Sequence, residues 1–484
     1  MDGSCVDTHK QSYYLQLFDI EGTDKQFYWN KCPCNESDAM IRRHCIPTIP
    51  NYDVNNQALK DLRSWSVGFA ERVRPLLKAR STLKEVVDQS RPSIKQRYKR
   101  AYRDLVYKRV DISEKHAMAK AFIKFEKIPL TKFEEGKAPR LIQYRSFEYL
   151  LLLKSCIKPF SDAIKTRKIL HSNSQPLDQI YTKTLTPAAL ATAMRGSWDS
   201  FPSPVAVCLD HSKFDGHYAK ELLDIEHDMW LVMFKSYLLK KLLKLQVNNV
   251  GFSQCGFKYK IKGTRLSGEY TTSDGNTTTN LGMIEVWLQS SGVTKYRLHI
   301  NGDDSVVILD SSDLDKLLPL DFFNNFNMET ELEAIAYDFR HIKYCQTSPI
   351  RVGGAWRMVK DPIRTLSRMA YADAKYALCR QRYVLGISLC ELAVSSGVPM
   401  LQSFCLRNLN SKAKPLGSVD KYPAKVASQK HLELQDISLE TRTDFAEAFG
   451  ISLSQQYAFE HEMAGQTDEL ALIVLEKYKQ FHLQ

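Results

Sequence analysis

The sequence predicts an α+β protein in which short strands dominate the centre of the chain and helices dominate its end. An apolar run at residues 205–209 is typical of a buried strand. Residues 296–309 contain two further short strands joined by N-G-D-D, a composition typical of a β-hairpin turn. Beyond Pro362 the apolar periodicity is mostly helical, over residues 366–401 and 444–482. Strands and helices that are separated along a chain in this way favour the α+β class.

The other elements follow in chain order. Residues 1–60 have no clear periodicity, whereas residues 56–107 have apolar side chains at helical spacing, interrupted by a loop at 90–93. Short strands are predicted at 121–123 and 140–142 around a charged loop, and a helix at 148–163. A long helix is predicted at 220–245, and a Gly/Thr/Ser-rich run at 263–279 leads into an apolar helix at 280–288. A chain of 484 residues has room for about two to four lobes of ordinary size.

The charge of the chain is concentrated in one segment. There are 67 Lys+Arg and 55 Asp+Glu, a net charge of +12 with a pI near 9.0. Residues 91–145 contain 16 of the basic and 6 of the acidic residues, which accounts for +10 of that excess. A local site for a polyanion is therefore favoured over a generally basic surface.

Several classes of protein are excluded or disfavoured. No apolar run reaches the roughly 18–20 residues that a membrane-spanning helix needs, and residues 1–10 lack a signal-peptide pattern. Eleven scattered cysteines indicate reduced thiols. A set of four residues could ligate zinc, although its spacing C-x-C-x9-H-C matches no common zinc finger: Cys32, Cys34, His44 and Cys45.

Two sets of carboxylates follow predicted strands. Asp210 and Asp215 come directly after the strand at 205–209, and Asp303 and Asp304 lie in the hairpin turn. Either set alone is ordinary, because Asp and Gly are common in turns. If adjacent strands bring Asp210 and Asp303 together, bound cations must offset their repulsion, and oxygen ligands suit Mg²⁺ or Mn²⁺. Two such ions would support an in-line displacement, and Gly302 would leave them room.

A polar pattern, S-G-x3-T-x3-N, lies between these sets and comprises Ser267, Gly268, Thr272 and Asn276. Thr272 and Asn276 are four residues apart, so on a helix they share one face and can address one ligand. The alternative is a helix N-terminus whose hydroxyls cap backbone amides.

In their order and spacing, these three patterns resemble motifs A, B and C of viral RNA-dependent RNA polymerases. The likeness is closest to the positive-strand group that contains the tombusviruses, with flaviviruses more distant. Four further blocks agree with the family: residues 137–145 resemble motif F, 90–98 motif G, 342–346 the block near motif E, and 397–402 a thumb segment.

This resemblance implies a right-hand polymerase fold of fingers, palm and thumb, with an antiparallel palm sheet carrying the catalytic aspartates and a mostly helical thumb. The expected boundaries are an N-terminal region or fingers extension (1–83), fingers with motifs G and F (84–200), palm motif A (201–219), a fingers insertion (220–262), palm motifs B to E (263–361) and the thumb (362–484).

The resemblance to viral RNA-dependent RNA polymerases also implies roles for individual residues. Asp210 and Asp303 would hold two Mg²⁺ or Mn²⁺ ions with Asp304 as an accessory, and all three would be catalytic. Asp215 and Asn276, helped by Ser267, Gly268 and Thr272, would select the ribose. The nucleotide access path would present cations to the triphosphate: Lys124, Lys127, Lys137, Arg140 and Arg145. Template RNA would contact Arg91, Lys95, Arg97, Lys99 and Arg100. The family pattern leaves the general acid open among Arg340, His341 and Lys343.

The implied activity is RNA-directed RNA polymerisation from NTPs, with template and nascent RNA as partners. Viral or host replication proteins, and membrane-associated complexes in the host cytoplasm reached through a partner, are implied as well. Two alternatives stay open from the residues. A reverse transcriptase-like polymerase would use dNTPs efficiently, and a non-enzymatic basic RNA-binding protein would explain the +10 segment but not the paired carboxylates.

Overall fold

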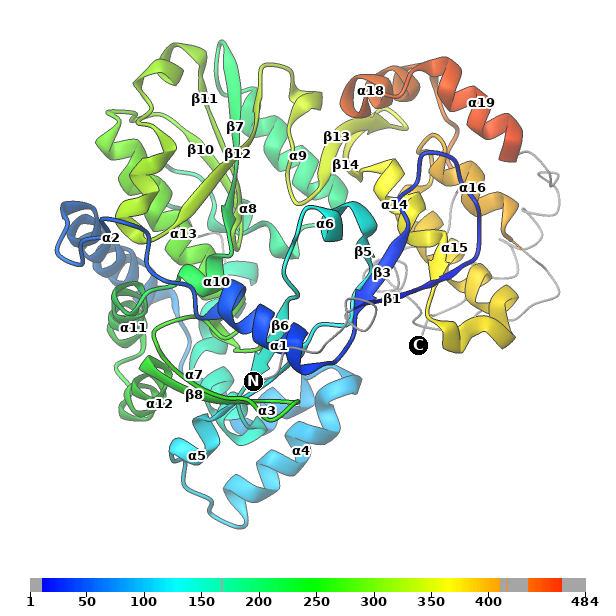
Figure 1. Cartoon of the computed structure of the whole chain (residues 1–484). Coiled ribbons are helices and arrows are strands. Elements are labelled where there is room, and N and C mark those ends of the chain that lie inside the picture. The colour runs from blue at the N-terminus through cyan, green and yellow to red at the C-terminus, as the bar shows by residue number, and fades with distance from the viewer. Residues whose placement is uncertain (1–10, 167–168, 410–415, 417–433, 464–484) are drawn as a thin grey trace.

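The computed structural model describes residues 11–166, 169–409, 416 and 434–463 (Figure 1). At its centre is an antiparallel sheet of order β10-β11-β7-β12, formed by β7 (Pro204–Ser212), β10 (Arg297–Asn301), β11 (Asp304–Asp310) and β12 (Glu329–Ala336). The strand at 205–209 and the hairpin at 296–309 are thereby confirmed. The α+β class is confirmed as well.

Both faces of the two inner strands are covered, which is why they are almost uninterruptedly apolar. Val207 and Leu209 point into a large core with the helix α13 (Thr271–Ser290), whereas Ala206 and Cys208 point into a smaller core with α9 (Pro187–Trp198). Strands that bury both faces read as continuous apolar runs. The sheet is therefore a rigid layer between two cores, and its strand ends carry the polar residues.

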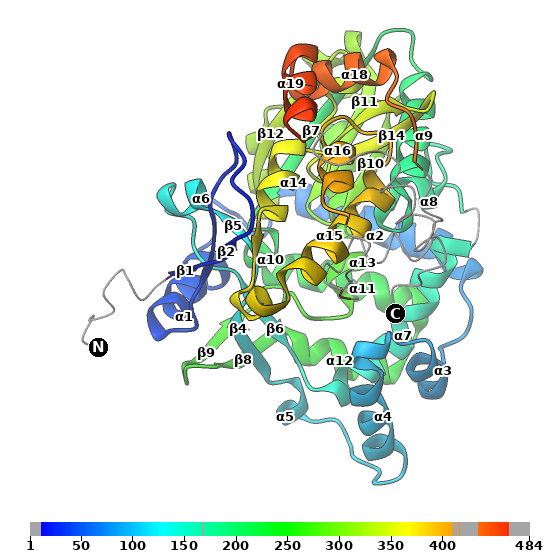
Figure 2. The ribbon, with the colours of Figure 1, turned by 90° about the vertical axis from the view of Figure 1, so that its right-hand side faces the viewer.

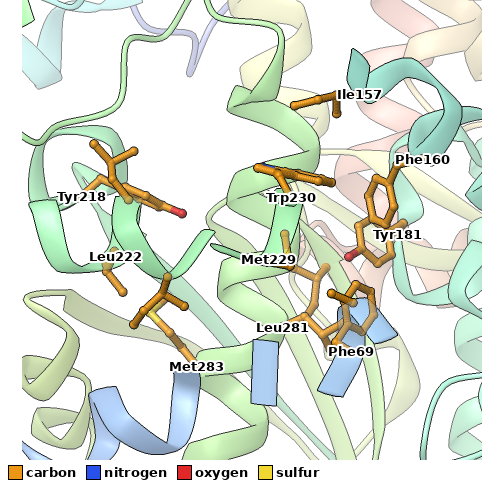
Figure 3. Close-up of a cluster of buried hydrophobic side chains, with 14 of the residues drawn as sticks. Phe69, Ile157, Phe160, Tyr181, Tyr218, Leu222, Met229, Trp230, Leu281 and Met283 are labelled. Atoms are coloured by element: carbon orange, nitrogen blue, oxygen red, sulfur yellow. The ribbon is translucent and has the colours of Figure 1, made fainter. Parts of the chain in front are cut away.

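The large core also receives α2 (Gln57–Val73), α7 (Phe147–Thr166) and α11 (Lys220–Phe234). Figure 3 shows its aromatic centre, where the rings of Phe160 and Trp230 meet edge to face at 5.0 Å and Phe69 approaches Phe160 at 6.4 Å. Such offset aromatic pairs contribute to packing beyond their buried area. This core fixes α13 against the sheet.

Two helices predicted in the middle of the chain differ from those observed. The helix expected at 220–245 is divided into α11 and α12 (Tyr237–Val247), because Lys235 adopts a left-handed conformation (φ 41°) and the Ser236 side chain caps the second helix. Helix α13 begins at Thr271 rather than at residue 280. Its threonines remain helical because their hydroxyls find partners within the core, as described below.

A second four-stranded sheet has the order β6-β4-β8-β9 and consists of β4 (Ala119–Ile123), β6 (Leu141–Tyr144), β8 (Asn248–Ser253) and β9 (Lys258–Lys262). The pair β4–β8 is parallel and the other pairs are antiparallel. One face packs on a core that includes Phe27, Trp29 and Leu266. The strands predicted at 121–123 and 140–142 are confirmed.

The N-terminal segment, where the sequence shows no periodicity, forms short strands that connect distant parts of the chain. β1 (Gln11–Tyr13), β3 (Gln26–Trp29) and β5 (Ile128–Pro129) form one sheet, while β2 (Leu15–Gln16) pairs with β15 (Tyr371–Ala372). Figures 1 and 2 show these strands beside α14 and α15. Two-residue strands carry too little sequence pattern to be predicted.

The remaining helices and strands are short or lie toward the C-terminus: α1 (Pro33–Ala39), α3 (Leu83–Asp88), α4 (Pro92–Val106), α5 (Glu114–Ala117), α6 (Leu130–Glu134), α8 (Leu177–Ile180), α10 (Phe214–His217), β13 (Thr347–Val352), β14 (Ala355–Lys360), α14 (Pro362–Met369), α15 (Arg380–Ser395), α16 (Leu401–Arg407), α18 (Leu439–Phe449) and α19 (Leu453–Met463). The predicted helix at 444–482 is two helices as far as residue 463, and its remainder lies outside the described residues. Within the described part, no helix has the length and apolarity to cross a membrane.

Candidate active site

The strand register brings carboxylates together at one end of the central sheet. Leu209 of β7 pairs with Ser305 of β11, so one residue further along the register sets Asp304 beside Asp210. On the other side of β7, Asp210 pairs directly with Glu331 of β12. Directly opposed residues in an antiparallel pair have Cβ atoms about 4.5–5.5 Å apart. The predicted meeting of the two carboxylate sets is therefore present, and Asp303 adjoins it at the hairpin tip.

Helix α13 holds this hairpin tip in place. The Asn280 side-chain amide donates to the carbonyls of Gly302 (2.9 Å) and Asp303 (3.3 Å), and the Thr277 hydroxyl accepts from the Gly302 amide at 2.9 Å. Gly302 has φ 72°, in the left-handed region that favours glycine, although an added Cβ would meet no atom within 4 Å. Backbone conformation, and not space, is what requires glycine here. Thr277 and Asn280, which follow Asn276 within the same helix, are not among the residues singled out from the sequence.

Proximity and partial burial raise the pKa values of these carboxyl groups. The pKa of Asp210 rises to about 6, first because of desolvation and then because of Asp303 and Glu331. The pKa of Asp304 rises to about 7, through desolvation and then through Asp303 and Asp210. Desolvation is also the largest cause of the raised pKa of Asp303. At neutral pH the carboxylates therefore repel one another in a partly dry site.

Two further acids, which the sequence reading missed, face the same cluster from β12. Glu331 is the register partner of Asp210, and Glu333 lies at a bulge between the paired residues Leu332 and Ala334. Desolvation raises the pKa of Glu333, followed by the charges of Asp210 and Glu331. The sequence does contain a signal for these acids, because Glu329, Glu331 and Glu333 alternate as residues on one face of a strand do. That pattern points to the carboxylate cluster only when β12 is known to pair with β7.

Asp215 and Asn276 form the predicted pair. The Asn276 amide donates to the Asp215 carboxylate at 2.8 Å, and its carbonyl oxygen accepts from Arg265 Nε at 3.0 Å. Because a guanidinium only donates, Arg265 fixes which way the Asn276 amide points. The pKa of Asp215 is raised, with desolvation the dominant cause and the bond from Asn276 opposing it.

Arg265 is itself held in a fully buried network that the sequence did not reveal. It forms an ion pair with Glu226 of α11 and lies over the Tyr218 ring, 4.3 Å from its centroid. Glu226 also accepts from the Tyr218 hydroxyl at 2.6 Å and from the Trp230 indole at 2.8 Å. Both oxygens of this buried carboxylate thus accept hydrogen bonds, as a buried charge requires.

The other residues of the polar pattern contact backbone. The Ser267 hydroxyl donates to the Leu141 carbonyl and accepts from the Gln143 amide, both at 3.2 Å, and the Thr272 hydroxyl donates to the Leu266 carbonyl at 2.8 Å. At Gly268 an added Cβ would lie 2.4 Å from the Gln143 carbonyl oxygen. Ser267 and Gly268 fasten the loop before α13 to strand β6, and Thr272 ties the first turn of α13 to that loop. Asn276 is the residue of the pattern that bonds to Asp215.

Two of the predicted access-path cations face the carboxylates. The charge of Lys137 lowers the pKa of Asp210, and that of Arg140 lowers the pKa values of Asp303 and Asp215. Arg140 shares Glu126 with Lys124, at N–O distances of 3.6 Å and 2.7 Å. Lys127 points elsewhere, since its ammonium donates to the Arg368 carbonyl at 2.7 Å, next to α14 and α15.

The prediction for Arg145 is wrong. Its side chain is 1% exposed, forms an ion pair with Glu269, and donates to the Asn249 side chain at 2.5 Å and to the carbonyls of Ala117 and Leu245. A guanidinium that is buried and donates from each of its three nitrogens to groups inside the protein is not available to a triphosphate. Arg145 instead joins β6 to β8 and to the loop before α13.

The predicted template contacts lie on or next to α4. Arg97, Lys99 and Arg100 are exposed, as is Arg91 directly before the helix, whereas Lys95 is half-buried and donates to the Asp88 carbonyl at 2.9 Å. This helix carries cations along its solvent side.

The three candidates for the general acid all lie near α18. Arg340 pairs with Asp338 and with the buried Asp444 of α18, and the Lys343 ammonium donates to Ser348 (3.1 Å) and to the Ala448 carbonyl (2.9 Å). His341 is half exposed, 3.9 Å from Glu447. All three side chains thus point to α18 or its surroundings.

Among the residues that the structure describes, no three His, Cys, Asp or Glu side chains are already grouped as a metal-binding set. This applies to the zinc candidates, of which His44 is buried and bonded through Nδ1 to the Gln143 amide at 2.9 Å. Asp210, Asp303 and Asp304 are compatible with a bound cation because they are negatively charged and offer oxygen ligands.

Comparison with known proteins gives a consistent result. A family model described as viral RNA dependent RNA polymerase matches residues 6–467. The chain is 30% identical to an RNA-directed RNA polymerase of melon necrotic spot virus, covering 75% of this chain and 47% of the relative. It is 31% identical to that of tobacco necrosis virus strain A (72% and 49%) and 30% identical to that of turnip crinkle virus (72% and 46%). The chain spans about half the length of the curated relatives it matches.

The raised pKa of Asp304 makes a prediction about stability. In the absence of metal ions, Asp304→Asn should raise the free energy of unfolding, by an amount of order 1 kcal/mol at pH 8, because it removes a charge that is desolvated and is repelled by Asp303 and Asp210. A raised folded-state pKa costs stability as pH rises from the unfolded value of 3.8 to about 7, so the gain should grow over that interval and then stay constant. Denaturant unfolding at several pH values measures it. Asp321→Asn, at an exposed position, is the control. A loss of stability, or a gain independent of pH, would contradict the electrostatic account.

Proposed function

Because the chain belongs to the viral RNA-dependent RNA polymerase family, we propose that it is an RNA-directed RNA polymerase that copies an RNA template from NTPs and releases pyrophosphate. The match confirms the resemblance seen in the sequence. The observation that carries the proposal is the juxtaposition of Asp210, Asp303 and Asp304 at one sheet end, next to the hydrogen-bonded pair of Asp215 and Asn276.

The architecture supports a right-hand arrangement. We assign the sheet β10-β11-β7-β12 to the palm, the sheet β6-β4-β8-β9 with α4 to the fingers, and residues 362–484 to a mostly helical thumb. The other boundaries are those expected from the sequence. They are an N-terminal region or fingers extension (1–83), fingers (84–200), palm motif A (201–219), a fingers insertion (220–262) and palm motifs B to E (263–361). What supports this assignment is the rigid antiparallel sheet whose strand ends carry the acids.

Asp210, Asp303 and Asp304 would hold two divalent cations, Mg²⁺ or Mn²⁺. Carboxylate oxygens suit these ions. The raised pKa values of Asp210 and Asp304 reflect desolvation first and then mutual repulsion, and a bound cation would offset that repulsion. When bound, the ions would stabilise the attacking and leaving oxygens of the displacement. The protein itself supplies a fixed hairpin tip and two basic side chains. Lys137 and Arg140 face the carboxylates and can neutralise the charge of a triphosphate.

Asp215 and Asn276 would read the ribose 2′-hydroxyl. Such a hydroxyl both donates and accepts, and a carboxylate beside an amide offers both functions. A deoxyribose would leave unfilled the hydrogen-bonding positions of these desolvated groups that their bond to each other does not use, which is how a polar site rejects an analogue that lacks the hydroxyl. This arrangement favours an RNA polymerase over a reverse transcriptase.

Partners and location are proposed on the resemblance alone. The chain would bind single-stranded template and nascent RNA, work with viral or host replication proteins, and act in the host cytoplasm at membranes reached through a partner.

The first test of the function uses Asp303→Ala. The variant should incorporate labelled NTPs on a single-stranded RNA template at least about a thousandfold more slowly than the wild type, because a metal-holding carboxylate is lost. Its affinity for RNA should stay within about twofold, since the basic surface is untouched. Wild-type protein with and without primer, and Asp313→Ala at a position remote from the sheet end, are the controls. Survival of incorporation would refute the assignment of Asp303, and inactivity of the wild type would favour the non-enzymatic alternative.

A second test concerns sugar selection. Asn276→Ala removes the donor to Asp215 and should lower the preference for NTP over dNTP by about 10- to 100-fold, mainly by improving the relative use of dNTP. Single-nucleotide incorporation kinetics with both substrates measure this ratio. Gln289→Ala, exposed at the far end of the same helix, should leave the ratio unchanged. An unchanged ratio for Asn276→Ala, or efficient dNTP use by the wild type, would exclude the proposed reading of the ribose.

A further inference from the structure

We propose that the outward face of the sheet β6-β4-β8-β9 is a platform on which bases of single-stranded template RNA stack between lysines. This inference rests on the proposed function and extends it beyond the reaction centre, to a binding surface formed by Tyr144, Lys120, Phe252 and Lys258. These four residues are called the sheet platform below.

The strand register places the platform residues in one row. Lys120 of β4 pairs with Tyr144 of β6 on one side and with Phe252 of β8 on the other, and Phe252 pairs with Lys258 of β9. Directly paired residues point to the same face of a sheet. An aromatic ring and an ammonium group therefore alternate across four strands, over about 14 Å at ordinary strand spacing.

The opposite face of the same strands packs on the core, so the platform residues lie on the other side of the sheet from it. Ala121 and Tyr259, each one residue from a platform position, are buried among the apolar side chains beneath the sheet. Lys120 and Lys258 are exposed, and Phe252 is 39% exposed. Phe252 therefore presents more than a third of its surface to solvent, on a face where Lys120 and Lys258 are exposed as well.

The row continues toward helix α4. The rings of Tyr144 and Phe147 lie 6.4 Å apart, and the Arg97 guanidinium of α4 lies 5.4 Å from the centroid of the Phe147 ring. At the other end, the Lys258 ammonium is 5.8 Å from the centroid of Phe252. Aromatic and cationic groups thus follow one another without interruption from β9 to the exposed cations of α4.

The charge of this face is of one sign. None of the four strands contains Asp or Glu, and β9 adds Lys260 and Lys262 on the same face as Lys258. In the described structure no ion pair engages Lys120 or these three lysines. Their charge is therefore available to a polyanion.

Single-stranded RNA fits both features of the platform. Its phosphates need cations, and its unpaired bases offer flat faces that stack on aromatic rings regardless of sequence. An anionic membrane surface would use the lysines but has no planar group for Phe252 and Tyr144. The alternation of the two residue types, more than the charge alone, favours RNA.

The test measures the affinity of the full-length protein for a fluorescent single-stranded RNA, without nucleotides, by anisotropy at several salt concentrations. Phe252→Leu keeps an apolar side chain but loses the ring, and should weaken binding at least about fivefold at every salt concentration. Phe252→Tyr should restore wild-type affinity. Replacing Lys120 and Lys258 together with alanine should weaken binding and reduce the salt dependence by about 1.4 in the slope of log affinity against log salt. Lys60→Ala, exposed on α2, is the matched control and should change neither quantity.

The outcomes separate this inference from the proposed function. Phe252→Leu binding RNA as tightly as the wild type would overturn the platform. So would variants that keep RNA affinity but lose binding to phosphatidylserine vesicles, because that result would assign the face to a membrane. Nucleotide incorporation is measured separately on the wild type, so an inactive wild type would refute the polymerase proposal without affecting the binding result.

Discussion

Like charges held together at the end of a sheet are the constraint on which the rest of this structure depends. Asp210 and Asp304 lie on neighbouring strands, Asp303 adjoins them, and Glu331 and Glu333 approach from the third strand. Carboxyl groups that are desolvated and close together have raised pKa values, so they either stay protonated at higher pH or repel one another. The fold accepts this cost because both faces of β7 and β11 are buried in cores that fix the register. Such stored repulsion is typical of a site that a cation completes.

The second level of organisation is a buried polar network around α13. Consecutive residues of this helix reach different elements: Thr277 and Asn280 hold the hairpin tip, Thr278 bonds to Tyr181 at 2.8 Å, and Thr279 bonds to Tyr218. Removing one partner from such a network leaves a buried group unsatisfied. The helix therefore transmits the rigidity of the aromatic core to the carboxylates and to the Asn276 amide.

Much of this arrangement could be predicted from local sequence. The strand before Asp210, the hairpin around Gly302 and the pairing of Asp215 with Asn276 depend on short patterns that the fold preserves. The long helix predicted at 220–245 is interrupted because Lys235 is left-handed and Ser236 caps a new helix. Helix α13 begins earlier than predicted, at Thr271, because tertiary partners satisfy its threonine hydroxyls. Local patterns carry little information about such helix boundaries.

Long-range pairing explains what the sequence could not provide. Arg145 stood in a basic block and looked like its neighbours, but its partner Glu269 is 124 residues away, in the loop before α13. Arg265 and Glu226 are likewise joined only in space. The acids of β12 and the aromatic row of the sheet platform become visible through strand register alone. Counting charges locates a basic segment but does not separate cations that face solvent from those that bind the protein itself.

The central claim, that the carboxylate cluster is completed by cations, is tested most directly by titrating the full chain with Mn²⁺ and counting free ions by electron paramagnetic resonance. Two ions per chain should bind, with an affinity that rises from pH 5 to about 7 as the raised carboxyl groups ionise and then levels off. Asp210→Asn should abolish binding of at least one ion. Binding that is absent at millimolar Mn²⁺, or that is unchanged by pH and by Asp210→Asn, would contradict the account.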